Sequence, residues 1–183
     1  IIFKDNAVHS SLFGFQFHNL LGQSCMRLQN FTAWKLTNVG IYSEINSAGL
    51  ELDNVNVADS SIGIVLHVIG GGGMSQQRID KTIKVKNLLL VGSSENDADC
   101  TVLKSPPARM CHSLTSRCRR TTQRVGMYLP IFNSKACMCP KIKPWWVPGG
   151  YPALGGGSYF DGVTLARFEK NACGSENYAI MNN

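Results

Sequence analysis

Two aspartates, Asp53 and Asp161, are the residues whose type and spacing could perform catalysis. They occupy the same position of a recurring phrase, which reads Leu-Asp-Asn-Val around the first and Phe-Asp-Gly-Val around the second. Glycoside hydrolysis needs a pair of carboxylates roughly 5 to 10 Å apart. If the phrases stack, both carboxylates face one groove, and Asp59 and Asp80 are further candidates. Because acids at turns usually cap the chain, the residues favour a non-catalytic protein, with polysaccharide hydrolase as the enzymatic alternative.

A basic segment could bind acidic glycans. Residues 100–160 contain nine of the 18 Lys and Arg residues and none of the 12 Asp and Glu residues. Arginine pairs with carboxylate or sulfate groups, and aromatic rings pack on sugar faces. The glycan-binding candidates are Arg117, Arg119, Arg120, Arg124, Trp145, Trp146 and Tyr151. The alternative is that the two tryptophans cover a flank of the fold and the arginines are merely solvated.

Cysteine usage predicts an extracellular protein. Six of the seven cysteines are disulfide candidates, with 15 possible pairings: Cys100, Cys111, Cys118, Cys137, Cys139 and Cys173. Zinc is disfavoured because Cys137-Met138-Cys139 lacks the usual finger spacing and no paired His accompanies it, so no metal and no cofactor are predicted. Cys25 remains as a buried thiol or as the partner of a residue outside this chain.

One glycosylation sequon, Asn30-Phe31-Thr32, fits the same extracellular context and predicts a glycan on Asn30. Nucleic acid is not expected as a partner, because disulfide-bearing and sequon-bearing chains are rarely found with it. The chain begins within a strand-like segment, Ile1-Ile2-Phe3. We therefore expect it to be a piece of a longer protein whose signal and membrane anchor lie elsewhere, and we expect neighbouring coils or another chain to cover these three residues.

The elements that must position these residues are predicted by a repeat. Apolar residues flank a central Asn or Gly in five phrases, which are centred on Asn19, Asn38, Asn54, Asn87 and Gly162. Spacings of 19 and 16 residues between the first three suit one coil of a solenoid, and alternation at period two predicts strands of four to six residues. Asparagines at one place in successive coils would form a side-chain ladder. We therefore predict an all-β fold, a right-handed parallel β-helix fragment with long disulfide-bearing loop insertions.

The repeat is interrupted in the middle of the chain. We assign residues 1–101 to β-helix coils, residues 102–148 to a basic, Cys-rich loop insertion with one strand near 125–132, and residues 149–183 to the final coils. A glycine run at 70–73 is a flexible excursion from one corner rather than a phosphate-binding loop, because no Gly-Lys-Ser/Thr and no helix pattern follow it.

Several of these phrases resemble the fibrocystin and fibrocystin-L family. They are Lys-Val-Lys-Asn-Leu-Leu-Leu-Val-Gly-Ser-Ser at 84–94, Val-Gly-Met-Tyr-Leu-Pro-Ile-Phe at 125–132 followed by Trp146 and Tyr151-Pro152, and Phe-Asp-Gly-Val-Thr-Leu-Ala-Arg-Phe at 160–168 followed by Cys173-Gly174 and Ala-Ile-Met-Asn-Asn at 179–183. The opening Lys-Asp-Asn-Ala-Val-His-Ser at 4–10 also resembles cell-surface hyaluronidases of the wider group. No catalytic motif of the hyaluronidases matches residues of this chain.

The resemblance implies a non-catalytic extracellular segment of a large cell-surface glycoprotein, with a structural, adhesive or receptor-like role on cilia, stereocilia or other surfaces. The implied partners are neighbouring coils or domains of the same longer chain, other extracellular proteins or acidic glycans. Contact with a membrane would occur only through an anchor outside this fragment. Binding or hydrolysis of a hyaluronan-like acidic glycan is the alternative function.

Overall fold

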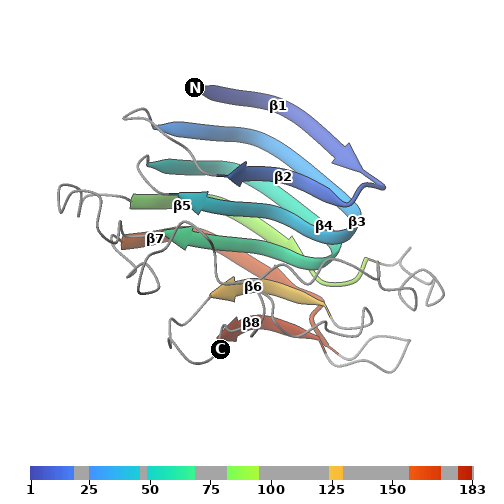
Figure 1. The fold of residues 1–183 in the computed structure, drawn as a ribbon. Helices are drawn as coiled ribbons and strands as arrows, with labels where there is room; N and C mark the ends of the chain where they lie inside the picture. Colours follow the sequence, from blue (N-terminus) through green and yellow to red (C-terminus); the bar gives the residue numbers. More distant parts are fainter. Residues whose placement is uncertain are drawn as a thin grey trace, which may run out of the picture.

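A computed structural model of the chain describes residues 1–18, 25–45, 49–68, 82–94, 124–129, 157–169 and 177–182 (Figure 1). Within these ranges the chain forms strands and short connections, without helix. The strands are β1 (Ile2–His9), β2 (Phe13–His18), β3 (Met26–Ile45), β4 (Leu50–Val68), β5 (Thr82–Val91), β6 (Val125–Leu129), β7 (Gly157–Ala166) and β8 (Tyr178–Asn182). All of their pairings are parallel. The predicted all-β, parallel architecture is confirmed, and the predicted disulfide-bearing insertions lie outside the described residues.

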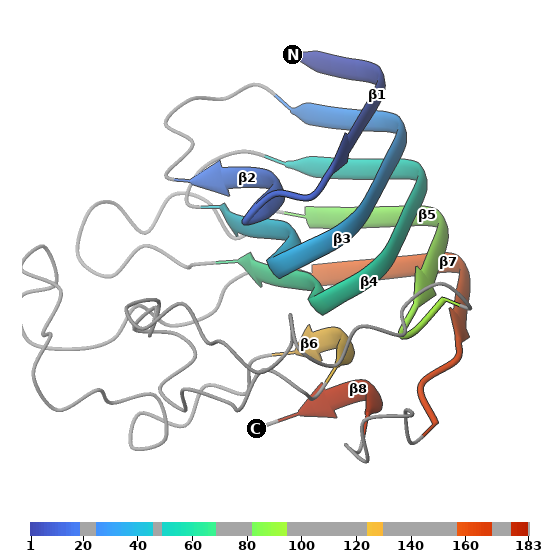
Figure 2. The same ribbon diagram turned by 90° about the vertical axis from the view of Figure 1, so that its right-hand side faces the viewer.

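The strands form five stacked coils (Figure 2). The first coil consists of β1 and β2, the second of β3, the third of β4, the fourth of β5 and β6, and the fifth of β7 and β8. Both β3 and β4 are far longer than the predicted four to six residues, with 20 and 19 residues. They remain paired along their length because each bends at residues of positive φ instead of ending there. The glycine run at 70–73 lies outside the described residues.

Each coil has three walls, which we name from its pairing register. In β3 the first wall is residues 26–29, the second is 31–34 and the third is 39–45, and the other coils follow in register. Leu28 of the first wall is aligned with Phe3 and Leu52, and this column continues through Val85 to Phe160. One coil therefore takes 25, 24, 33 and then 75 residues of chain, and the repeat lengthens where the sequence predicts insertions.

The corner between the first and second walls is occupied by residue types that tolerate a left-handed backbone. Its column is Asp5, Asn30, Asn54, Asn87 and Gly162, with φ values of 58°, 49°, 54°, 51° and 67°. Because Cβ disfavours positive φ in most residues, Gly, Asn and Asp are the types that enter this region routinely. The local chemistry of these five residues therefore fixes where each coil turns.

The predicted amide ladder exists at this corner, but its members differ from the prediction. Asn30 Nδ2 donates to Asp5 Oδ1 at 2.7 Å, and Asn54 Nδ2 donates to Asn30 Oδ1 at 2.9 Å. Asn38 is instead at the second corner, where its backbone N–H donates to Leu12 O at 3.1 Å, and Asn19 lies outside the described residues. The spacings of 19 and 16 residues were wrong because a coil with three walls needs 24 residues or more.

The core fills the space between the walls. Its fully buried members include Leu28, Leu52, Val55, Ile64 and Leu90, all with exposed fractions of 0%. Burying a Leu or Ile side chain stabilises the folded state by about 2 kcal/mol, so stacking of like apolar positions is the main force that joins the coils. A second buried apolar cluster is formed by third-wall residues, which are Val39, Tyr42, Val65, Val125 and Tyr128.

A column of glycines marks the start of the third wall. Gly14, Gly40, Gly63 and Gly126 follow one another in register, and Ala179 ends the column. A Cβ added to Gly40 would lie 2.4 Å from the Gly63 carbonyl oxygen and 2.4 Å from Val57 Cγ1. Only a residue without a side chain fits between this carbonyl and the opposite wall.

Candidate functional site

The outer face of the first wall is an alternating ionic surface. Arg27 donates to Glu51 across one coil, with the Nη2–Oε2 distance at 2.8 Å and the Nε–Oε2 distance at 3.0 Å. Lys86 Nζ lies 3.8 Å from Glu51 Oε1. Since these side chains are partly exposed, each pair contributes only about 0 to 1 kcal/mol to stability. Acids and bases on this face therefore neutralise one another along the stack.

The two predicted catalytic aspartates lie in one column of this surface, with Lys86 between them. Asp53 and Asp161 are two coil steps apart, which corresponds to about 10 Å between strands. Asp53 Oδ1 accepts a hydrogen bond from Asn87 Nδ2 at 3.3 Å, and Asp161 is exposed. Because Lys86 stands between the two aspartates in register, the two carboxylates are not on neighbouring strands. A catalytic role for either aspartate stays a prediction.

Asp59 is a buried carboxylate that fastens two coils together. It is 4% exposed. Its Oδ1 accepts from the Ser94 backbone N–H and its Oδ2 accepts from Ser94 Oγ, both at 2.6 Å. The carboxylate thereby holds the chain that follows β5, so it acts as a structural clasp. Asp80 lies outside the described residues.

Most of the predicted glycan-binding and disulfide residues fall outside the described ranges. Of the seven glycan-binding candidates only Arg124 is described, and it is 2% exposed. Its backbone N–H donates to Asn177 Oδ1 at 2.9 Å, and its carbonyl accepts from the Tyr178 N–H at 2.8 Å. Arg124 thus joins the fourth coil to the fifth from within the fold. Glycan binding by the other candidates stays a prediction: Arg117, Arg119, Arg120, Trp145, Trp146 and Tyr151.

The sequon residue and the unassigned cysteine are both described. Asn30 is exposed and is the central member of the corner ladder, where its amide both donates and accepts. Glycosylation there stays a prediction. Cys25 is a free, exposed thiol. The first of its two predicted states, a buried thiol, is therefore wrong, because Cys25 precedes the first wall of β3 instead of lying within it. Pairing with a residue outside this chain stays a prediction. The six disulfide candidates lie outside the described residues.

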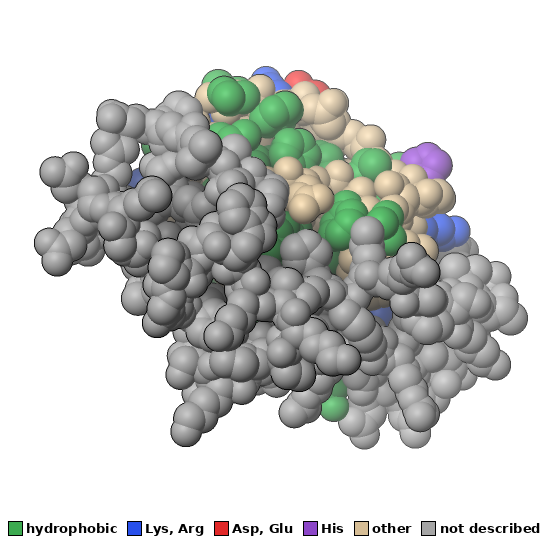
Figure 3. Space-filling view, viewed as in Figure 1, with side chains coloured by type: hydrophobic (Ala, Val, Ile, Leu, Met, Phe, Trp, Pro, Cys, Tyr) green, Lys and Arg blue, Asp and Glu red, His purple; other side chains and the backbone are tan. Residues whose placement is uncertain are grey.

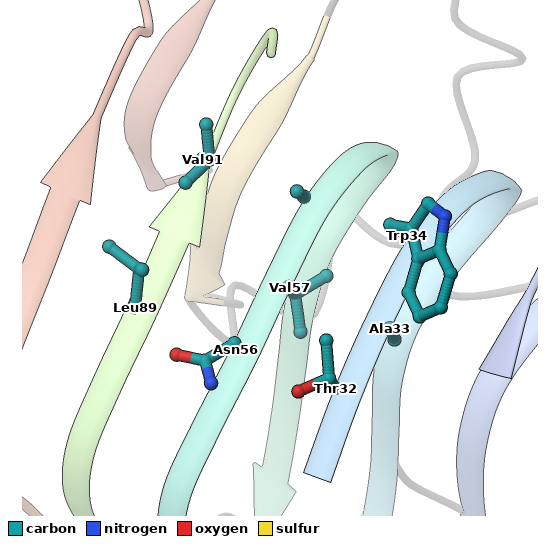
Figure 4. Close-up of a pocket in the computed structure, with 8 residues that line it drawn as sticks. Thr32, Ala33, Trp34, Asn56, Val57, Leu89 and Val91 are labelled. Atoms are coloured by element: carbon teal, nitrogen blue, oxygen red, sulfur yellow. The ribbon is translucent and has the colours of Figure 1, made fainter. Parts of the chain in front are cut away.

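A neutral groove on the outer face of the second wall was missed by the sequence patterns (Figure 4). The small Ala58 side chain leaves a hollow of about 130 Å³ beside Trp34, closed on the far side by Leu89 and Val91. The Trp34 ring is stacked on His9 of the first coil, with ring centroids 4.6 Å apart at an angle of 22°. Lys, Arg, Asp and Glu are absent from its lining, so this groove offers no acid–base groups.

The groove could have been predicted from a small residue that lies between two large residues in a column of outward-facing side chains. The column reads His9, Trp34, Ala58, Val91 and Ala166, but it becomes visible only after the register is known. The glycine column could have been found more easily. Each glycine stands between two apolar residues, as in Phe13-Gly14-Phe15 and Val39-Gly40-Ile41.

The described coils therefore define a class of protein, a stacked parallel β-coil scaffold whose polar side chains mainly connect coil to coil. Within the described ranges no three His, Cys, Asp or Glu side chains are grouped to hold a metal ion. Nor do these ranges contain a helix that is long and apolar enough to cross a membrane.

Comparison with known proteins finds similarity to one kind of protein. The chain is 28% identical over 179 residues to fibrocystin-L of Mus musculus and, to the same extent, to fibrocystin-L of Homo sapiens. Each alignment covers 97% of this chain and 4% of the relative, so the chain spans a small part of the proteins it matches. No family model matches the chain, and no solved structure matches it. The predicted resemblance to fibrocystin-like proteins is confirmed, as a sequence similarity over nearly the whole of this chain.

Proposed function

We propose that the chain is a non-catalytic extracellular segment of a fibrocystin-like cell-surface glycoprotein, in which it acts as a rigid right-handed parallel β-helix. The observation that carries this proposal is the use of polar side chains for joining coils. The corner amides, the Arg27–Glu51 pair and the Asp59 clasp each connect residues of different coils. A surface whose charged groups are engaged in this way suits a load-bearing or adhesive scaffold better than it suits a reaction.

The role has two parts. The stacked walls give stiffness, because each coil is attached to the next by a full set of parallel backbone hydrogen bonds and a continuous apolar core. The loops predicted between the coils would present variable surfaces for adhesive or receptor-like contacts. We place the segment at the cell surface, with the ciliary or stereociliary membrane as the specific location and with the membrane anchor elsewhere in a longer chain.

Antibody labelling of cells that express the longer protein tests the location. An antibody raised against this segment should label intact cells without permeabilisation, with signal along cilia. Labelling that requires permeabilisation would refute an extracellular position.

Incubation of the purified chain with hyaluronan tests the non-catalytic assignment. The length distribution of the glycan should remain unchanged, and matched reactions with Asp53→Asn and Asp161→Asn variants should be indistinguishable from the wild type. Shortening of the glycan by the wild type that either variant abolishes would establish a hydrolase instead.

A further inference from the structure

The outer face of the second wall contains no Lys, Arg, Asp or Glu among the described residues. Its outward side chains form two columns, which are Ala7, Thr32, Asn56, Leu89 and Thr164, and His9, Trp34, Ala58, Val91 and Ala166. Charged side chains are instead frequent on the first wall, and in Figure 3 they lie at the edges of the described surface, around hydrophobic and uncharged ones. The groove beside Trp34 therefore opens on a neutral face of the stack.

This groove belongs to the inner coils of the stack. Its outward-facing lining residues come from the second, third and fourth coils, and they are Thr32 and Trp34, Asn56 and Ala58, and Leu89 and Val91. Further coils at either end of the stack would pair with the first or the fifth coil. They would leave the groove open, so its accessibility does not depend on where this chain begins or ends.

The glycosylation sequon leads directly into the groove. We propose that an N-linked glycan on Asn30 extends along the second wall and docks in this groove, with a sugar ring against the Trp34 indole. This docking rests on the proposed function, because N-glycans are added to exported chains. Thr32, the last residue of the sequon, lines the groove, and Trp34 follows on the same strand. At about 3.3 Å per residue, Thr32 lies about 7 Å and Trp34 about 13 Å along the strand from Asn30, within reach of the first sugars.

The corner ladder leaves room for this modification. The Asn30 amide carries two hydrogens on Nδ2, and the bond to Asp5 Oδ1 at 2.7 Å uses one of them. A sugar replaces the other hydrogen, while Asn30 Oδ1 continues to accept from Asn54 Nδ2 at 2.9 Å. Because Asn30 is exposed, the glycan and the ladder are compatible.

The Trp34 indole presents an aromatic surface to the hollow. His9 covers the side of the indole toward the first coil, with ring centroids 4.6 Å apart. Ala58 stands on the other side of Trp34 in the same column, so the uncovered aromatic surface borders the hollow beside it. Stacking on His9 also holds the ring in place, which lowers the entropic cost of binding a sugar to it.

The remaining lining suits an uncharged N-acetylated sugar. Such a sugar has an apolar face of C–H groups, hydroxyls at its edge and an acetamido group. Figure 4 shows the Thr32 hydroxyl and the Asn56 amide on the face that also holds Trp34, where they offer donors and acceptors to sugar hydroxyls. The hollow of about 130 Å³ is several times the share of one water in the liquid, about 30 Å³, so an acetamido group can enter it.

Two other occupants fit the groove less well. An acidic glycan would place its carboxylates or sulfates against a lining without Lys or Arg, where they would lose hydration without gaining an ion pair. A protein partner needs about 20 to 30 residues on each side of a stable interface, whereas eight residues line this groove. A tethered neutral glycan needs only a small site, because its attachment keeps its local concentration high.

Oxidation by hydroxyl radicals measures whether the glycan covers Trp34. The full chain is fused to a secretion signal and produced in cells that attach high-mannose N-glycans, and mass spectrometry of the peptides reports both glycan occupancy at Asn30 and oxidation of Trp34. The comparison is with Thr32→Val, which removes the sequon and keeps a β-branched side chain of similar size. Trp34 in the glycosylated chain should be oxidised about fivefold more slowly than in Thr32→Val. Circular dichroism of each sample confirms that the coils are folded.

A glycan on another wall provides the matched control. In the Thr32→Val background, Lys84→Asn with Lys86→Thr creates a sequon on the outer face of the first wall. Oxidation of Trp34 should then equal that of Thr32→Val alone. Slower oxidation in this control would show that any glycan shields the chain, which overturns docking in the groove.

Removal of the indole tests the same contact from the side of the glycan. An endoglycosidase that cuts between the first two sugars is added to the folded chain, and its initial rate at Asn30 is measured. Trp34→Ala should raise this rate about fivefold, because the released glycan becomes accessible. Lys35→Ala changes the next residue, which is exposed and outside the lining, and should leave the rate unchanged.

Each result supports or overturns the docking. Slow oxidation of Trp34 with the glycan present, together with faster trimming in Trp34→Ala, supports it. Equal oxidation with and without the glycan overturns it, because the glycan then extends into solvent. Slow oxidation that persists in Thr32→Val also overturns it, because another molecule then covers Trp34. An Asn30 without glycan in the secreted chain overturns the docking alone, since antibody labelling of intact cells tests the extracellular position separately.

Discussion

Gly40 is a position at which a small chemical change should cause a large loss of stability. It lies at the start of the third wall of β3, in register with Gly14 and Gly63. The methyl group introduced by Gly40→Ala would lie 2.4 Å from both the Gly63 carbonyl oxygen and Val57 Cγ1. Carbon atoms in favourable contact are about 3.5 to 4.0 Å apart, so the neighbours would have to move by about 1 Å.

Moving either the Gly63 carbonyl or the Val57 side chain would destabilise the fold. The Gly63 carbonyl belongs to a strand fixed on both sides, because Ile62 and Ile64 pair with β3 on one side and with β6 on the other. Val57 is 2% exposed and packed within the core. Overpacking a rigid core costs about 3 kcal/mol, and the reduced entropy of the unfolded alanine chain offsets about 0.5 kcal/mol. We expect Gly40→Ala to lower the free energy of unfolding by about 2.5 kcal/mol.

Gly49→Ala provides the matched control. A Cβ at Gly49 would lie 3.3 Å from Cys25 Sγ and 3.5 Å from the Thr82 carbonyl oxygen. These contacts require a shift of only a few tenths of an ångström, so the free energy of unfolding should change by less than about 0.5 kcal/mol. The same chemical substitution is therefore placed in two environments that differ mainly in the space available.

Urea titration of both variants and the wild type measures the difference. Far-ultraviolet circular dichroism and tryptophan fluorescence should report coincident transitions, which would justify a two-state treatment. With an unfolding slope of about 2.5 kcal/mol per molar urea, the midpoint of Gly40→Ala should fall by about 1 M while that of Gly49→Ala remains close to the wild type. Equal midpoints for the two variants would refute the packing explanation of the glycine column.

Further substitutions test the amide ladder, the Asp59 clasp and the backbone conformation at the corner. Asn30→Ala should lower the free energy of unfolding, measured in urea, by about 2 kcal/mol, because it removes both ladder hydrogen bonds of that amide and a residue suited to positive φ. The control Asn56→Ala should lower it by less than about 0.5 kcal/mol, and equal losses for the two variants would contradict the ladder. Asp59→Ala should lower the free energy of unfolding by about 3 kcal/mol, because two hydrogen bonds from Ser94 to a buried carboxylate are lost. An unchanged midpoint of thermal unfolding would argue against the clasp. Gly162→Ala should lower the free energy of unfolding by about 1 kcal/mol, and Gly162→Asn should lower it by less than half of that, because asparagine tolerates the left-handed backbone. If denaturation shows a larger loss for Gly162→Asn than for Gly162→Ala, the proposed corner geometry is wrong.

Local residue chemistry explains the parts of the fold that the sequence predicts correctly. Alternating apolar residues predict strands, and the phrases around Asn54, Asn87 and Gly162 mark true corners because Asn and Gly adopt positive φ readily. The alignment of Asp53 with Asp161 is also predicted from the sequence, because both stand at the same position of the repeated phrase and both lie in one column. These properties depend on a few neighbouring residues, so a linear pattern contains them.

Tertiary structure alone decided which corners stack. Asp5 and Asn30 belong to the ladder although neither stands in the repeated phrase, and Asn38 stands in the phrase although it lies at the other corner. The groove beside Ala58 likewise depends on alignments between residues that are 24 and 33 positions apart. Local backbone preference determines at which residues the chain can turn. The number of residues between turns is set by the walls that must close around a shared core, and that requirement involves every coil at once.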